Sequence, residues 1–219
     1  MGAITRTFAN NITTAGVLQP GAFENASFNN VTSVQSGAVG TGAKTFIASA
    51  TASGDATIDF TSGIDSTYKT YVFYFINIHP ATDDTILSCQ FDTGTNTNYN
   101  QTITSTFYAA RHNESDSTNF GYITNRDQAQ GTDFVKLNYD TGNANDESTN
   151  GYLKLFDPSN GTFVTQFLAR SSGNGYGGSG AQDSQVAGYI NTPTAITRVR
   201  FKMTSGNIDS GKIVLYGMS

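Results

Sequence analysis

The sequence predicts an all-β protein, an antiparallel β-sandwich of the jelly-roll kind that follows an extended N-terminal arm. Short runs rich in Thr, Tyr, Phe and Val alternate with turns that contain Gly, Asn or Pro, and this alternation favours strands. No run combines helical periodicity with helix caps, so a parallel sheet with helical connectors is disfavoured. About ten strands of this length are typical of a jelly roll or a close relative, and an up-and-down barrel is the weaker alternative.

The first 43 residues differ from the rest of the chain. Their apolar side chains are scattered without a sustained period of 2 or 3.6, and residues 36–42 resemble a flexible linker. Because such a segment cannot form its own core, we expect residues 1–43 to be an arm that orders against a partner, with a partly disordered tail as the alternative. The anchoring residues that we expect in this arm are Ile4, Phe8, Ile12 and Val17.

The sandwich is expected over residues 44–219, and its first strands are the clearest. Runs 45–50 and 56–60 are separated by Ser-Gly-Asp, which favours a hairpin. Run 68–78 is apolar on both faces, so it should lie centrally and end at the following His-Pro pair. Further strands are expected at 84–91, 101–110, 132–139, 151–156, 163–170, 185–190, 195–203 and 211–217, with a hairpin turn at 207–211.

Composition argues against several classes of function. The formal net charge of −5 disfavours a broad nucleic-acid-binding surface. No stretch approaches the ~18 apolar residues of a membrane span, and the opening residues lack the apolar run of a signal peptide. The single cysteine, Cys89, excludes an intrachain disulfide, and we expect it to be a buried apolar side chain.

Neither catalysis nor a cofactor is expected. The chain has two histidines and no nucleophile elbow, phosphate-binding loop or dinucleotide fingerprint, although paired carboxylates of a glycoside hydrolase need only spatial proximity. Segment 140–147 offers oxygen ligands for calcium but lacks the EF-hand spacing, so an Asn/Asp-rich turn is the better interpretation. We therefore predict no metal site.

Candidate binding residues occur in three places. The glycine-rich segment 173–180 is expected to be a mobile surface loop, and Tyr176 within it suits a contact loop. Arg111 and His112 form a polar cluster after a strand. If 195–203 is a strand, its alternation places three cations on one face, as either an ordinary solvated surface or a contact strip for an acidic neighbour or an anionic glycan. These cations are Arg198, Arg200 and Lys202.

The C-terminal run 201–217, FKMTSGNIDSGKIVLYG, resembles the terminal segment of a family of small structural proteins from marine and cyanobacterial tailed phages. The resemblance extends to residues 9–14, 60–69, 77–80 and 155–159, and so is spread over most of the chain. It implies a virion-associated protein, among head-decoration, tail-fibre or knob-like components. It supplies no catalytic or ligand-binding residues.

Together these expectations describe a non-enzymatic protein of the phage particle surface, attached to the capsid or tail through its arm. One role is a decoration subunit, and the alternative is a fibre or knob that binds a host surface glycan. A homotrimer is the expected assembly, although the sequence does not fix it. A bacterial surface lectin and a polysaccharide depolymerase are weaker alternatives.

Overall fold

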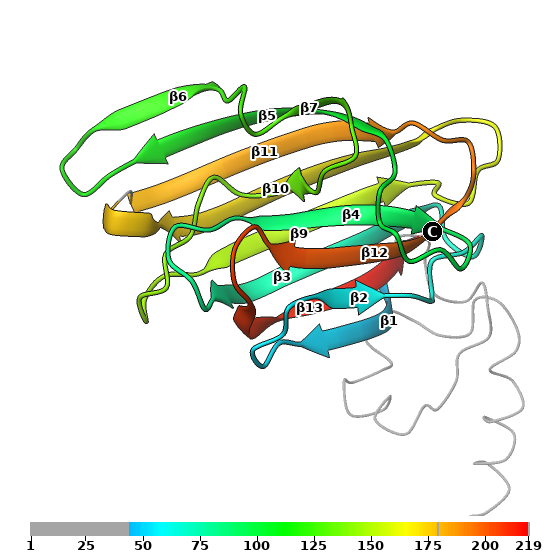
Figure 1. Ribbon diagram of the computed structural model, residues 1–219, viewed down its shortest axis with the longest axis horizontal. Helices are drawn as coiled ribbons and strands as arrows, with labels where there is room; N and C mark the ends of the chain where they lie inside the picture. Colours follow the sequence, from blue (N-terminus) through cyan, green and yellow to red (C-terminus); the bar gives the residue numbers. More distant parts are fainter. Residues whose placement is uncertain (1–43, 179, 219) are drawn as a thin grey trace, which may run out of the picture. The chain divides into compact units, whose positions relative to one another are not determined.

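The computed structural model describes residues 44–178 and 180–218, and this part of the chain is all-β. Its strands form two antiparallel sheets that pack face to face, as Figure 1 shows. The predicted fold class is therefore confirmed. The predicted arm over residues 1–43, with Ile4, Phe8, Ile12 and Val17, lies outside the described residues.

The large sheet has nine strands. Their order across the sheet is β1, β13, β3, β9, β10, β11, β5 and β6, and β7 also pairs with β5. These strands are β1 (Lys44–Thr51), β3 (Thr70–Pro80), β5 (Ile103–His112), β6 (Thr118–Tyr122), β7 (Gln128–Gly131), β9 (Thr149–Phe156), β10 (Thr165–Gly175), β11 (Gly180–Ile190) and β13 (Ile208–Met218). β3 lies between β13 and β9, in agreement with the central position predicted from its two apolar faces.

The small sheet has four strands, in the order β2, β12, β4 and β8. They are β2 (Ile58–Phe60), β4 (Leu87–Thr93), β8 (Val135–Lys136) and β12 (Ile196–Met203). In Figure 1, β4 and β12 lie in front of the large sheet, and side chains from both sheets join one hydrophobic core.

The core is built from aromatic rings that bridge the two sheets. Phe201 on β12 packs edge-on against Phe73 and Phe75 of β3, with ring centroids 5.3 and 5.5 Å apart. Phe91 on β4 meets Phe167 on β10 at 5.5 Å. Such ring pairs add to the stabilisation that burial itself provides. Cys89 is fully buried in the same core, as predicted, and burial raises the pKa of its thiol.

Two turns predicted as hairpins are instead crossings between the sheets. The Ser-Gly-Asp turn at 53–55 leads from β1 in the large sheet to β2 in the small one. The predicted turn at 207–211 lies largely inside β13, where Ile208 is fully buried, and residues 204–207 lead there from the small sheet. Turn-forming residues suit a hairpin and a corner equally, so they do not determine which strand pairs with which.

Two further differences concern polar segments. No strand was predicted at β6 or β7, which lie at the margin of the large sheet and contain Asn, Gln and Gly. Segment 173–180 is not the loop that was predicted, because β10 and β11 pair as far as Gly175 and Gly180. Between these strands the described residues form a 3-10 turn, η2 (Tyr176–Gly178).

Candidate functional site

The predicted basic strip lies on the outer face of the small sheet, while Val199, Phe201 and Met203 point into the core. Two of its three cations are engaged by the protein itself. Arg198 donates from Nε to the carbonyl oxygen of Gly94 at 3.0 Å, and Arg200 makes a bidentate pair with Asp59 at 2.8 and 2.6 Å. Lys202 lies over the ring of Phe134 at 4.4 Å and lines a hollow described below.

Arg111 and His112 are neighbours in sequence but lie on opposite faces of β5. Arg111 stacks on the ring of Tyr139 at 4.1 Å. His112 contacts the carboxylate of Asp116 at 3.1 Å and pairs with Ala181 of β11, beside the tip of the β10–β11 hairpin. Both residues lie next to the glycine-rich hairpin, since Arg111 pairs with Gln182 of β11, but their side chains are directed to opposite faces of the sheet.

Tyr176 occupies the tip of that hairpin and is 43% exposed. Its backbone N–H donates to Asp140 Oδ1 at 3.1 Å, and the side-chain amide of Gln182 donates to the same oxygen at 2.6 Å. Asp140 and Gln182 are both buried, so the tip is tied to a buried polar group. The tip thus presents Tyr176 on an ordered turn.

The segment considered for calcium contains a turn that is closed by hydrogen bonds between Ala144 and Glu147. Glu147 Oε2 accepts from the backbone N–H of Ala144 at 2.8 Å, and the backbone N–H of Glu147 donates to the Ala144 carbonyl at 2.9 Å. Within residues 44–178 and 180–218, no group of three or more His, Cys, Asp or Glu side chains is arranged to hold a metal ion.

The outer face of the large sheet carries a row of side chains that crosses six strands. The strand register places one residue of each strand directly opposite a residue of the next strand, from β3 through β9, β10, β11 and β5 to β6. We call them the transverse row: Tyr74, Tyr152, Arg170, Gln185, Tyr108 and Tyr122. Because neighbouring strands lie about 4.8 Å apart, the row extends over roughly 24 Å.

The polar groups of the transverse row are held by hydrogen bonds, within the row or to adjacent residues. Arg170 donates from Nε and from a terminal nitrogen to the two oxygens of Asp183, both at 2.8 Å. This bidentate contact holds the pKa of Asp183 below its usual value. The hydroxyl of Tyr108 donates to the side-chain oxygen of Gln185 at 2.6 Å. Asp183, next to the row, thus neutralises Arg170, and these contacts hold the side chains in place.

Aromatic rings dominate one end of the row. Tyr74 packs edge-on against Tyr152 with centroids 6.4 Å apart, and against Tyr216 at 5.9 Å. Phe46 continues the cluster, 6.0 Å from Tyr216 and 58% exposed. Edge-to-face packing fixes the rings while leaving part of each accessible. Lys44 lies over the Tyr74 ring at 4.5 Å and Lys154 over the Tyr152 ring at 4.9 Å, so this end combines aromatic rings with two ammonium groups.

Two hollows adjoin the row. One, of about 390 Å³, is lined by Asn150, Tyr152, Arg170 and Asp183. The other, of about 600 Å³, is mostly apolar and is lined by Phe156, Leu168, Tyr189 and the small side chains between them. Small-molecule sites are concave and combine apolar walls with a few fixed polar groups, as these hollows do.

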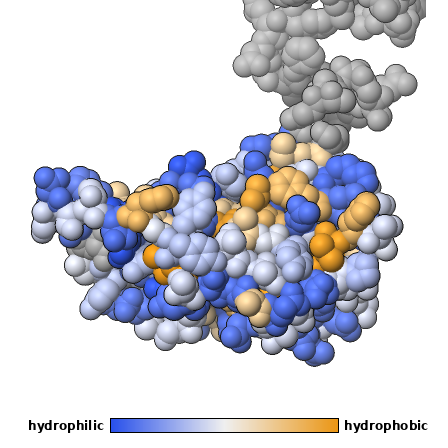
Figure 2. Space-filling model, turned by 90° about the horizontal axis from the view of Figure 1, so that it is seen from above, coloured by the Kyte–Doolittle hydropathy of each residue, from blue (hydrophilic) through white to orange (hydrophobic). Residues whose placement is uncertain are grey.

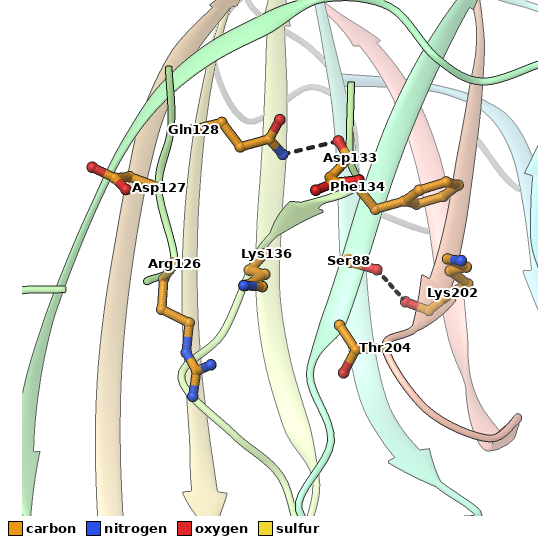
Figure 3. A pocket seen from close by; sticks show the side chains of 9 residues that line it. All are labelled: Ser88, Arg126, Asp127, Gln128, Asp133, Phe134, Lys136, Lys202 and Thr204. Carbon is orange, nitrogen blue, oxygen red and sulfur yellow. Dashed lines mark hydrogen bonds between the residues drawn. The ribbon is translucent and has the colours of Figure 1, made fainter. Parts of the chain in front are cut away.

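A third hollow, of about 280 Å³, lies at the β8 side of the small sheet (Figure 3). Three cations, Arg126, Lys136 and Lys202, line it, together with Asp127 and Asp133. Among the described residues, none of these cations forms an ion pair. Lys136 donates to the Asn125 carbonyl at 2.7 Å instead. We call it the basic hollow.

Elsewhere the surface is mixed. Figure 2 shows one side of the molecule, on which hydrophobic residues lie in small separate groups among hydrophilic ones. Helices long and apolar enough to cross a membrane are absent from the described residues.

Sequence reasoning identified Lys202 of the basic hollow but missed the transverse row. The row draws single residues from six strands, and only the register brings them together. The alternation in runs such as 150–156 places Tyr152 on one face, but it does not show which side chains lie opposite it. Comparison with protein-family models finds no match to this chain, and neither does comparison with curated proteins.

Proposed function

We propose that this protein is a non-enzymatic, glycan-binding surface protein of a tailed-phage particle, and that the transverse row contacts the glycan. The observation that carries the binding function is the row itself, a continuous surface of tyrosine rings and planar polar groups. Sugar rings present C–H faces that pack on aromatic rings, and hydroxyls that exchange hydrogen bonds with guanidinium, carboxylate and amide groups.

Its dimensions support an extended ligand. A row of roughly 24 Å with a hollow at either side suits several linked sugar units better than a single small molecule. The ion pair of Arg170 with Asp183 neutralises the middle of the row and favours a neutral sugar unit there, while Lys44 and Lys154 add positive charge at the Tyr74 end. The carboxylate of Asp183 has both oxygens occupied by Arg170, so it is not placed as the acid of a hydrolase.

The binding test uses the full chain and a microarray of neutral oligosaccharides. We expect Tyr152→Ala to weaken binding about tenfold, since aromatic rings are among the side chains that carry most of the affinity of an interface. Tyr152→Phe keeps the ring and should retain most of the binding. Phe163→Ala is the matched control, because Phe163 is 72% exposed and lies outside the row. Equal binding by Tyr152→Ala and wild type would refute the assignment of the row.

The virion assignment depends on the sequence resemblance and has its own test. Purified phage particles would be labelled with gold-conjugated antibody against residues 44–219. Gold confined to the tail or one vertex supports the fibre or knob role, whereas gold over the whole head supports the decoration role. Particles without label would refute a virion location and leave glycan binding to be judged by the microarray.

A further inference from the structure

We infer that the basic hollow is a second ligand site, which binds the oxyanion group of an acidic sugar unit. The hollow is formed mostly by the small sheet and its flanking segments, with Gln128 contributed by β7, whereas the transverse row lies wholly on the large sheet. The inference therefore does not depend on the function proposed for the row.

Charge is the first argument. The chain carries a net charge of −5, yet three cations line one hollow of about 280 Å³. Figure 3 shows Lys136 between Arg126 on one side and Lys202 on the other. Like charges brought together without carboxylate partners repel one another, and a bound anion would relieve that repulsion.

The two carboxylates at the hollow offset only part of this charge and form no ion pair with its cations among the described residues. Asp127 accepts a hydrogen bond from the hydroxyl of Tyr122 at 2.5 Å, and Figure 3 shows its side chain directed away from Lys136 and Lys202. Asp133 is exposed and forms no ion pair among the described residues. The lining thus keeps a net positive charge.

Arg111, which shares an aromatic ring with Arg126, adds to the positive potential at the hollow. Arg126 lies 5.1 Å from the ring of Tyr139, and Arg111 lies 4.1 Å from the same ring. The Nε atoms of both arginines are buried, and neither has a hydrogen-bond partner among the described residues. Two guanidinium groups that share one ring add positive potential next to the hollow.

The remaining lining indicates a sugar as the carrier of the anion. Phe134 gives the hollow an aromatic wall, and Thr204 and Ser88 add hydroxyl groups. A volume of about 280 Å³ is close to the lower limit for small-molecule sites, so it suits a single unit. A long polyanion such as nucleic acid is disfavoured, because the net charge of the chain would repel it.

The test is a titration of the full, ¹⁵N-labelled chain with glucuronate, followed by NMR at low salt. We expect shifts at the amides of Phe134, Lys136 and Lys202, and little response to glucose, which lacks the carboxylate. Lys136→Gln and Lys202→Gln should each weaken binding about fivefold, whereas Asp133→Asn should strengthen it by a similar factor. Lys212→Gln removes an exposed lysine from the large sheet and is the matched control.

Three outcomes would overturn the inference. Equal shifts with glucose would show that the oxyanion is not recognised. Inorganic phosphate that binds as tightly as glucuronate would assign the hollow to a free oxyanion instead of a sugar. Shifts with an acidic peptide but none with glucuronate would assign it to a protein partner. Retained glucuronate binding in Tyr152→Ala would separate this site from the transverse row.

Discussion

The transverse row and the basic hollow differ in whether their charged side chains have a partner of opposite charge. In the row, Arg170 and Asp183 neutralise each other through two hydrogen bonds, and tyrosine rings supply the exposed surface. In the hollow, Lys136 and Lys202 have no carboxylate partner among the described residues. The difference indicates that one fold can present a neutral, ring-rich face and a cationic pocket on separate sheets.

The largest effect is expected from a substitution in the core that supports both surfaces. Phe201 is fully buried between the sheets and contacts Phe60, Phe73 and Phe75. We expect Phe201→Ala to lower the free energy of unfolding by about 3–5 kcal/mol, from lost burial and the cavity left behind. Denaturant unfolding measures the loss, and both surfaces should lose binding together. Loss at the hollow alone would show that the sheets are not coupled through this ring.

A substitution at Gly151 should separate the two surfaces. A Cβ atom there would lie 2.2 Å from the carbonyl oxygen of Arg170, which is backbone and cannot move aside easily. We expect Gly151→Ala to cost roughly 1–3 kcal/mol of stability and to displace Arg170 within the row, while glucuronate binding at the hollow persists.

Gly161→Ala is the control for that substitution, because a Cβ atom at Gly161 would meet no atom within 4 Å. The melting temperature and the glycan-array binding of the two variants would be measured and compared with those of the wild type. A Gly151→Ala protein with unchanged stability and unchanged array binding would contradict the close approach of β9 and β10.

The smallest expected effect is the response of the row to pH. Hydrogen bonds from Arg170 lower the pKa of Asp183 below its ordinary value of 3.8. The carboxylate therefore contributes stability above pH 3.8, and this contribution is lost as the pH falls through the lowered pKa. The stability difference between wild type and Asp183→Asn should shrink at low pH. A difference that is constant from pH 6 to pH 2 would show that the pair does not set this pKa.

The sequence predicted the strands better than their partners. Alternation and turn residues located most strands within a few residues, including the central one that became Thr70–Pro80. β7 was missed because Gln128–Gly131 is short and polar, and β6 was missed because the alternation that places Phe120 and Tyr122 on one face spans only five residues. The two false hairpins arose because neighbours in sequence joined different sheets.

What the sequence alone determined is the all-β class, the burial of Cys89 and the alternation that turns Arg198, Arg200 and Lys202 outward from β12. These properties depend on local periodicity, which the chain carries within each strand. Tertiary structure decided the transverse row and the basic hollow. Both gather residues from distant segments, and sheet order and register, which arise from packing across the whole core, fix which side chains become neighbours.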